Sequence, residues 1–171
     1  LRPWRVRSMP DAPWTEFSMK RRFAAALQVG AFCGAGLLLA GGVSAQGLLR
    51  PDDSATVTQG KSVYDTYCAA CHGRELEGQP NWRQRRPDGK LPAPPHDASG
   101  HTWHHDDVLL ARITKYGTEA LMGGSYRSDM IGFGNVLSDA EIIAVLSYIK
   151  STWPSEIREQ HDRINARAAR R

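Results

Sequence analysis

The feature that most constrains this chain is a short cysteine–histidine motif, Cys68-Ala69-Ala70-Cys71-His72. In a helix, the two thiols of a C-x-x-C-H motif lie one turn apart, where they can form thioether bonds to the two vinyl groups of a haem. The histidine that follows lies next to the same ring, and its imidazole can bind the iron. The motif therefore predicts one haem c, covalently attached through Cys68 and Cys71, with His72 as an iron ligand.

Zinc sites and redox dithiols also use closely spaced cysteines. A structural zinc site needs a second ligand pair of similar spacing, and a thioredoxin-like dithiol lies in a βαβ context. The sequence offers neither. The third cysteine, Cys33, lies in an apolar segment that we expect to be removed on export, so no disulfide framework remains.

The N-terminal region has the order of a secretory signal. A basic run at residues 20–22 is followed by the apolar stretch 23–39 and by small residues that end at Ala45. This order predicts a signal peptide over residues 19–45, cleaved after Ala45. The mature protein is then expected in the periplasm as a soluble monomer. An uncleaved membrane anchor is the alternative, since the apolar stretch is nearly long enough to span a bilayer.

The remaining chain divides into four parts by composition. Residues 1–18 match neither a signal nor a domain, and we expect Met19 to be the true start. Residues 46–55 are a polar leader that we expect to be flexible, and residues 56–154 carry the motif and the helical patterns of one domain. Residues 155–171 form a charged C-terminal tail that we expect to be at most a loose helix.

The net charge of +4 does not indicate nucleic-acid binding. Residues 1–45 carry six basic and two acidic residues, which accounts for the whole excess, while residues 46–171 carry 16 of each sign. Nucleic-acid binding proteins concentrate positive charge on the folded domain. We therefore expect no nucleic-acid partner.

Three stretches show helical periodicity, at residues 58–71, 106–116 and 138–153. Either Thr56 or Thr58 can cap the first. Between them lie two long stretches without a sustained period, residues 74–104 with five prolines and residues 123–134. Long irregular loops are unusual in a small domain unless they surround something. We expect an all-α fold of about three main helices and long loops around one covalently attached haem.

The third stretch is the clearest helix. Ser138 and Glu141 form a capping box at its start, and Pro154 ends it. Its predicted buried stripe consists of apolar residues at helical spacing, Ile142, Val145, Leu146, Ile149 and Trp153.

The second axial ligand is expected to be a methionine. Downstream of the predicted cleavage site the chain contains Met122 and Met130, and a thioether is a ligand that raises the potential of haem iron. Either residue can instead fill a gap in the core. Gly132 and Gly134 after Met130 let the backbone pass close to a ring, which favours Met130 over Met122.

Other residues of the proline-rich stretch are candidates for contacts with the haem. Trp82 and Trp103 can donate their indole N–H groups to the propionates. The carbonyl of Pro94 or of Pro95 can accept from the second ring nitrogen of His72 and so set its tautomer. A group of histidines (His96, His101, His104 and His105) leaves open a second metal site.

These features resemble the class I c-type cytochromes over residues 60–153. The stretch YCAACHG around the motif resembles the attachment segment of that family, and Met130-Ile131-Gly132-Phe133 resembles its Met-Pro-x-Phe loop. Gly60 and Tyr148 match a glycine and an aromatic residue that pack together in the family. One departure is Ile131, which stands where the family usually has proline.

The resemblance implies a fold of the cytochrome c type for the domain of residues 56–154, with His72 and Met130 as iron ligands. It implies one-electron transfer between a redox protein donor and an acceptor, as in a respiratory chain, and not catalysis by the protein itself. Two alternatives remain open. One is a haem enzyme or gas sensor with an open sixth site, and the other is a subunit of a larger dehydrogenase or oxidase complex.

Overall fold

The computed structural model describes residues 47–123 and 126–171. Over these residues it is helical and contains no strands, apart from a single bridge between Gly117 and Ile131. The predicted all-α fold is confirmed. The predicted signal peptide, residues 19–45, and residues 1–18 lie outside the described residues.

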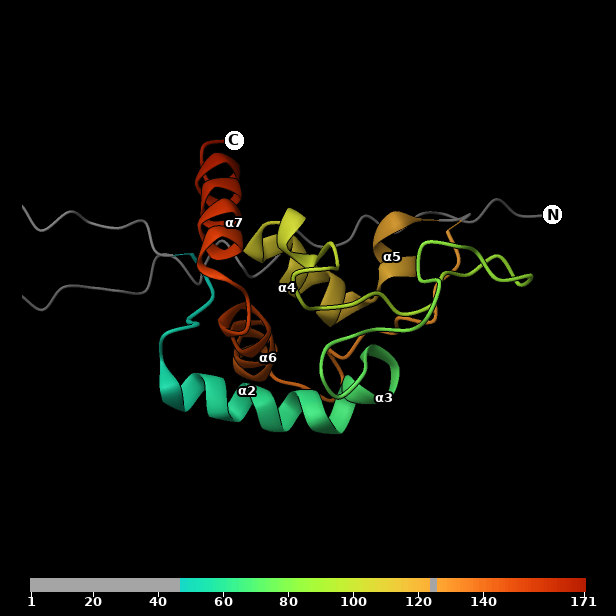
Figure 1. Ribbon diagram of the computed structural model, residues 1–171, viewed down its shortest axis with the longest axis horizontal. Helices are drawn as coiled ribbons and strands as arrows, with labels where there is room; N and C mark the ends of the chain where they lie inside the picture. The colour runs from blue at the N-terminus through green and yellow to red at the C-terminus, as the bar shows by residue number, and fades with distance from the viewer. Residues whose placement is uncertain (1–46, 124–125) are drawn as a thin grey trace, which may run out of the picture. The chain divides into compact units, whose positions relative to one another are not determined.

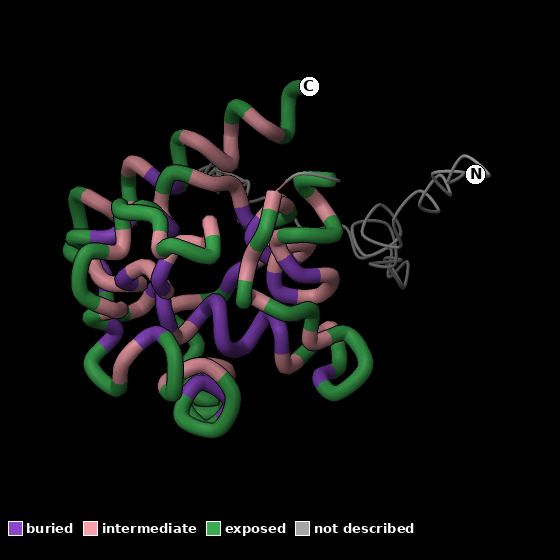
Figure 2. Tube along the Cα trace, turned by 90° about the vertical axis from the view of Figure 1, so that its right-hand side faces the viewer, coloured by how far each residue is buried: buried purple, intermediate pink, exposed green. Residues whose placement is uncertain are grey.

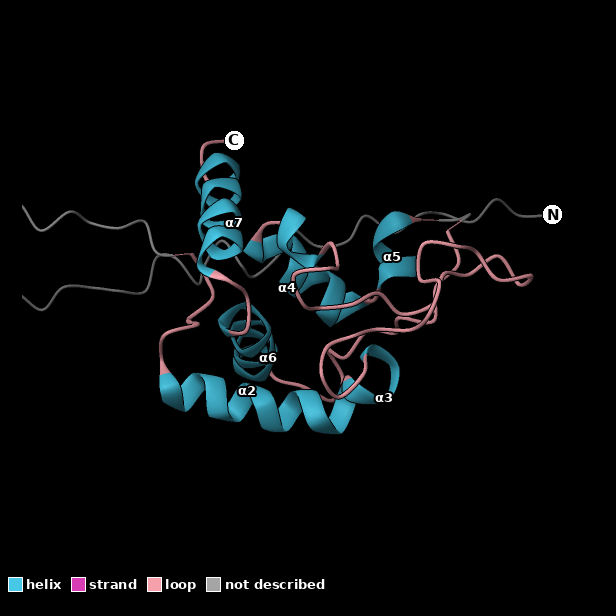
Figure 3. Ribbon diagram, viewed as in Figure 1, coloured by secondary structure: helices cyan, strands magenta, loops and turns pink. Residues whose placement is uncertain are grey.

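Six α-helices and one short 3-10 helix follow one another along the described chain (Figures 1 and 3). They are α2 (Ser54–Tyr67), α3 (Ala69–His72), η1 (Thr102–His104), α4 (Asp107–Tyr116), α5 (Thr118–Met122), α6 (Asp139–Ser151) and α7 (Ser155–Ala168). Within the described residues, none of these helices combines the length and the apolar character needed to cross a bilayer.

Helices α2 and α6 form the central packing contact, with α6 crossing over α2 (Figure 1). The close approach depends on Gly60, because a Cβ atom there would lie 1.9 Å from the carbonyl oxygen of Ala144 and 2.9 Å from the Cβ of Tyr148. The ring of Tyr64, fully buried, lies 5.5 Å from the ring of Tyr148. The glycine–aromatic contact that the resemblance implied is therefore present.

Helix α6 supplies more buried hydrophobic residues than any other helix of the described chain. All five residues of its predicted stripe are buried, together with Ile143 and Ala144. Burying one such branched side chain stabilises a fold by about 1.5–3 kcal/mol. Figure 2 shows this buried stretch of the trace running through the interior, with exposed residues on the outer turns.

The helix ends follow local rules, with one correction. The capping box of α6 is formed as predicted: Glu141 N–H donates to Ser138 Oγ (3.3 Å), and Ser138 N–H donates to the Glu141 carboxylate (2.8 Å). Helix α2, by contrast, is capped by Asp53, whose carboxylate accepts from the N–H groups of Ala55 and Thr56. The predicted Thr56 or Thr58 cap is wrong, because α2 starts earlier, at Ser54.

Two helices differ from the predicted pattern. The first predicted helix is divided, since α2 ends at Tyr67 and α3 restarts after Cys68. Helix α5 follows α4 directly after Gly117, in a region with no predicted helix. Gly117 has a φ of +84°, which favours glycine and allows the abrupt change of direction between α4 and α5.

The predicted loose tail is a formed helix, α7, with a polar anchor. Asn165 donates from its side-chain amide to Asp107 Oδ1 (2.9 Å) and accepts from the Asp107 N–H (2.8 Å). The second carboxylate oxygen of Asp107 accepts from Leu49 N–H (3.0 Å). His161, which is fully buried, lies against Trp153 and bonds the carbonyl of His105 (2.8 Å). The charged composition of residues 155–171 did not indicate this anchor, because only a few positions of α7 face the core.

Candidate functional site

The cysteine–histidine motif lies where α2 gives way to α3. Cys68 is both the C-cap of α2 and the N-cap of α3, and its carbonyl accepts from the N–H groups of Cys71 (3.1 Å) and His72 (2.9 Å). This local turn brings the two cysteines and the histidine to the same short helix. Cys71 is exposed and Cys68 is partly exposed, and both are free thiols.

His72 is buried and its ring is fixed by the proline-rich loop. Its Nδ1 lies 2.8 Å from the carbonyl oxygen of Pro94. Because a carbonyl can only accept, Nδ1 carries the proton, and the lone pair lies on Nε2. Burial lowers the pKa of His72 and outweighs the hydrogen bond to Pro94, which raises it, so the ring is neutral at neutral pH. A neutral imidazole with a free Nε2 is the form that ligates a metal.

This contact decides between two predicted acceptors. The sequence left Pro94 and Pro95 open, and the structure has the carbonyl of Pro94 at hydrogen-bonding distance. The loop is held in this place by further backbone bonds: Gly78 N–H donates to the His72 carbonyl (2.7 Å), and His96 N–H donates to the Leu76 carbonyl (2.8 Å). The prediction that this loop orients the histidine is confirmed.

The Cys68 thiol lacks the lowered pKa of a redox dithiol. Burial, and to a smaller extent Cys71, raises the pKa of the Cys68 thiol to about 11. Reactive dithiols have a lowered pKa, since the thiolate is the nucleophile. A protonated thiol next to a second one, followed by a neutral imidazole held from behind, matches the donor set for a covalently bound haem. The residues present therefore fit haem c.

The sequence did not predict that His96 contacts His72. The ring of His96 stacks on the ring of His72, with centroids 4.0 Å apart and planes at 24°. Its own Nδ1 lies 2.8 Å from Thr102 Oγ1, and its carbonyl accepts from the indole of Trp153 (2.8 Å). Burial and the neighbouring His72 lower the pKa of His96 well below its ordinary value. Its position two residues after Pro94 was the available signal.

The two methionines have different surroundings. Met122 ends α5 with 64% of its surface exposed, whereas Met130 is half-buried and lines a cavity of about 380 Å³ with Tyr116 and Gly132. The backbone of Met130 is held on both sides, because its N–H donates to Ser128 Oγ (3.1 Å) and its carbonyl accepts from Thr118 N–H (3.3 Å). A fixed backbone and a sheltered side chain are what a ligand needs, and Met130 has both.

The two tryptophans contact histidines of the same loop. The ring of Trp82 lies parallel to that of His101, with centroids 5.3 Å apart, and the ring of Trp103 stacks on His104 at 3.7 Å. The indole N–H of Trp103 donates to the carbonyl of Ala98 (3.3 Å). The indole N–H of Trp103 thus already has a hydrogen-bond acceptor within the chain. A role for either tryptophan at the propionates stays a prediction.

The histidine group does not form a metal site. His96 stacks on His72, His104 stacks on Trp103, and His101 meets His105 edge to face at 5.4 Å. In the part of the chain that the structure describes, no three His, Cys, Asp or Glu side chains are arranged to hold a metal ion. These histidines pack against aromatic rings instead.

Together the fold and the site define a small all-α protein whose residues fit a covalently bound haem. Comparison with known families agrees: a family model described as cytochrome c matches residues 57–153, more than half of the chain. The chain belongs to the cytochrome c family, and its domain is that of a haem-binding electron carrier. No curated protein and no solved structure matches the chain significantly.

Proposed function

We propose that this protein is an exported cytochrome with one haem, bound through Cys68 and Cys71, that transfers single electrons between two redox proteins in the periplasm. The observation that carries the proposal is the buried, neutral imidazole of His72, aligned by Pro94 directly after the two cysteines. Bound haem c supplies an iron that alternates between the ferric and ferrous states, one electron at a time.

The residues of the chain have separate parts in this function. His72 offers Nε2 to the iron, and the Pro94 carbonyl keeps the proton on Nδ1, so the ring has one orientation and one tautomer. Met130 would offer a neutral thioether as the second iron ligand, which would favour reduced iron. A chain with both ligands fixed changes little when the electron arrives.

Covalent attachment has a direct test. Denatured holoprotein extracted with acidified organic solvent should keep its colour and give the pyridine spectrum of a c-type haem. The double variant Cys68→Ala, Cys71→Ala should lose its haem under the same treatment. If haem extracts freely from the unmodified protein, the proposal fails.

The choice of Met130 has a matched control in Met122. Met130→Ala should abolish the weak far-red band of a sulfur–iron bond, lower the potential, and allow ferrous haem to bind carbon monoxide readily. Met122→Ala should leave all three unchanged. The reverse pattern would make Met122 the ligand. A haem that binds carbon monoxide readily in the unmodified protein would favour an open-site enzyme or gas sensor.

Export is proposed from the order of basic, apolar and small residues before Ala45. N-terminal sequencing of the protein from periplasmic extracts should begin at or near Gln46. A mature protein that keeps residues 23–39 would instead be anchored in the membrane. A monomeric mass with one haem per chain is expected for the carrier.

A further inference from the structure

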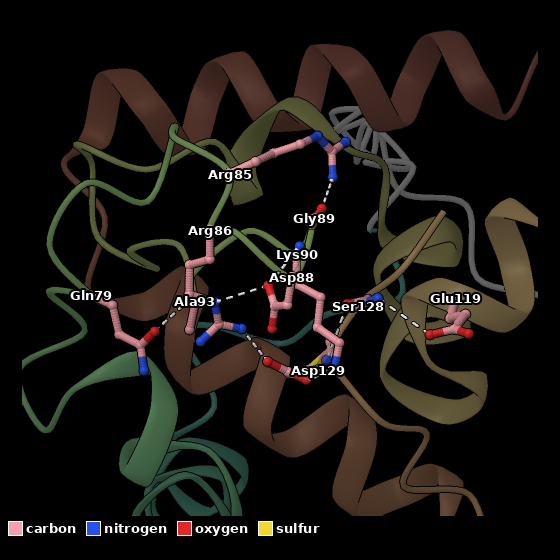
Figure 4. Close-up of polar contacts among 11 residues, drawn as sticks. Gln79, Arg85, Arg86, Asp88, Gly89, Lys90, Ala93, Glu119, Ser128 and Asp129 are labelled. Carbon is pink, nitrogen blue, oxygen red and sulfur yellow. Dashed lines mark hydrogen bonds and ion pairs between the residues drawn. The ribbon is translucent and has the colours of Figure 1, made fainter. Parts of the chain in front are cut away.

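Asp129, the residue immediately before Met130, lies in a cluster of ion pairs that joins two loops distant in sequence. Its two carboxylate oxygens bind different cations: one accepts from the Arg86 guanidinium, and the other accepts from the Lys90 ammonium (Figure 4). The cations come from the proline-rich loop, 43 and 39 residues earlier in the chain. We call Asp129, Arg86 and Lys90 the Asp129 cluster.

The two cations are carried by a turn that is stabilised by its own hydrogen bonds. Residues 86–90 form a tight turn in which Gly89 N–H donates to the Arg86 carbonyl (2.8 Å) and Arg86 N–H donates to the Lys90 carbonyl (2.9 Å). Asp88 accepts from Lys90 N–H (3.0 Å) and lies 3.7 Å from Arg86 Nε. Since the turn orders the backbone that carries both side chains, less backbone conformational entropy is lost when they bind a carboxylate.

The opposite side of the Met130 segment is bound to other elements. Ser128 N–H donates to the Glu119 carboxylate (3.2 Å) of α5, and Ser128 Oγ accepts from Met130 N–H. The carbonyl of Met130 and the bridge between Ile131 and Gly117 attach the segment to the junction of α4 and α5. The Asp129 cluster therefore supplies the attachment in the other direction, toward the proline-rich loop.

That loop also carries Pro94, the residue that orients His72. One segment, residues 79–94, thus contacts the supports of both proposed iron ligands: Pro94 on the histidine side, and Arg86 with Lys90 on the methionine side. A second contact joins the same two loops: the guanidinium of Arg85 lies 5.4 Å from the ring of Tyr126.

We infer that Asp129 is a positioning residue for the iron site: its ion pairs with Arg86 and Lys90 hold the Met130 segment so that the sulfur stays at the iron. The inference rests on the proposed function, in which Met130 is the ligand. It also accounts for Ile131, because a segment without proline after the methionine needs stiffness from another source.

Ion pairs with this much exposure contribute modestly to global stability. Asp129 is about half exposed, with a side-chain exposure of 51%. Their effect is expected on the local equilibrium in which the sulfur leaves the iron and another ligand enters. The measurement must therefore report on the sixth position and not only on unfolding.

The experiment uses holoprotein variants and imidazole as the added ligand of the ferric haem. Asp129→Asn should bind imidazole about two- to fivefold more tightly than the unmodified protein, with a weaker far-red band. The double variant Arg86→Gln, Lys90→Gln should show the same change, and Asp129→Glu should restore most of the unmodified behaviour. The difference in imidazole affinity between Asp129→Asn and the unmodified protein should shrink in about 1 M salt, because salt screens exposed charges.

Asp65→Asn is the matched control, because Asp65 is an exposed carboxylate paired with Lys61 on α2 (2.7 Å). It should leave imidazole binding unchanged. Equal imidazole affinity in Asp129→Asn and the unmodified protein would overturn the inference, and so would an equal change in the Asp65 variant. An unmodified protein without the far-red band would show a different failure, that of Met130 as the ligand, and this inference would fall with it.

Discussion

The helices and the long loops of this protein are held together by different forces. Helices α2 and α6 meet through buried apolar side chains, and among the described residues α6 supplies six of the buried hydrophobic residues by itself. In the loop residues 74–104, the buried apolar residues are Leu76, Pro92 and Pro95, and the path is set by bonds to carbonyls such as that of Pro94. Figure 3 shows much of this loop chain beside α3 and α5.

This difference predicts how far the effect of a substitution spreads through the molecule. Apolar packing is dense and mutually supporting, so a disturbance in one helix affects the whole fold. Bonds to single carbonyls and exposed ion pairs act locally, so their loss is expected at the haem and not in global unfolding. Both proposed ligands lie next to the loops: His72 ends α3, just before the loop of residues 74–104, and Met130 lies in the segment between α5 and α6.

The largest expected effect comes from removing the haem. The variant Cys68→Ala, Cys71→Ala, prepared without haem, should lose cooperative unfolding, because the loops bury little of their own apolar surface. That loss is comparable to the whole stability of a small domain, about 5–15 kcal/mol. Thermal unfolding followed by circular dichroism measures it, with the holoprotein as reference. A sharp transition in the haem-free variant would show that α2 and α6 suffice.

The next largest effect is expected at the contact between α2 and α6. In Gly60→Ala the new methyl group would lie 1.9 Å from the Ala144 carbonyl oxygen, so the helices must move apart. Overpacking of this kind costs about 1–3 kcal/mol or more. Urea unfolding of the holoprotein measures the change, and Gln59→Ala, at an exposed neighbouring position, is the control. A normal unfolding midpoint in Gly60→Ala would contradict the described packing.

A smaller effect is expected where α7 joins the domain. Asn165→Ala removes two hydrogen bonds to Asp107, a residue that is only 3% exposed. The carboxylate of Asp107 then has one hydrogen-bond donor fewer. Leaving a buried polar group unsatisfied costs about 1–3 kcal/mol. Hydrogen exchange along α7 should accelerate while the haem spectrum stays unchanged. Arg167→Ala, exposed on the same helix, should show neither change.

The smallest effect is expected at the start of α6. Ser138→Ala removes the capping bond and should cost about 1 kcal/mol. Bonds from Ser138 lower the pKa of Glu141 below its ordinary value of 4.5. A lowered pKa in the folded state adds stability above pH 4.5, and this contribution is lost as the pH falls through the folded-state pKa. Urea midpoints between pH 3 and pH 7 should therefore depend less on pH in Ser138→Ala. An unchanged pH dependence would contradict the capping box.

Sequence reasoning succeeded where the information lies within a few residues. The cysteine–histidine motif, the capping box of Ser138 and Glu141, and the buried stripe of α6 all depend on spacings of three or four positions. Helical geometry converts such spacings directly into neighbours in space. The first cap failed by this same logic, because Asp53 offered an equally good carboxylate closer to the true start of α2.

Contacts between distant parts of the chain were settled only by the tertiary structure. The choice of Pro94 over Pro95 and the stacking of His96 on His72 depend on the path of a long loop. The anchor of α7 joins Asn165 to Asp107 at the start of α4. The partners in that anchor are 58 residues apart. No periodic pattern links such pairs, since loop residues have no fixed repeat and many loop paths satisfy the same composition.

The sequence by itself determined the attachment motif, the helical class of the fold and the pair of methionines from which the second ligand is proposed. The tertiary structure decided how the supports of the two proposed ligands are joined, through one loop that contacts His72 by Pro94 and the Met130 segment by Arg86 and Lys90. The physical reason is the range of the interactions. Backbone hydrogen bonds within a helix follow from neighbours in the chain, whereas a hydrogen bond or ion pair across loops exists only once folding has brought its partners together.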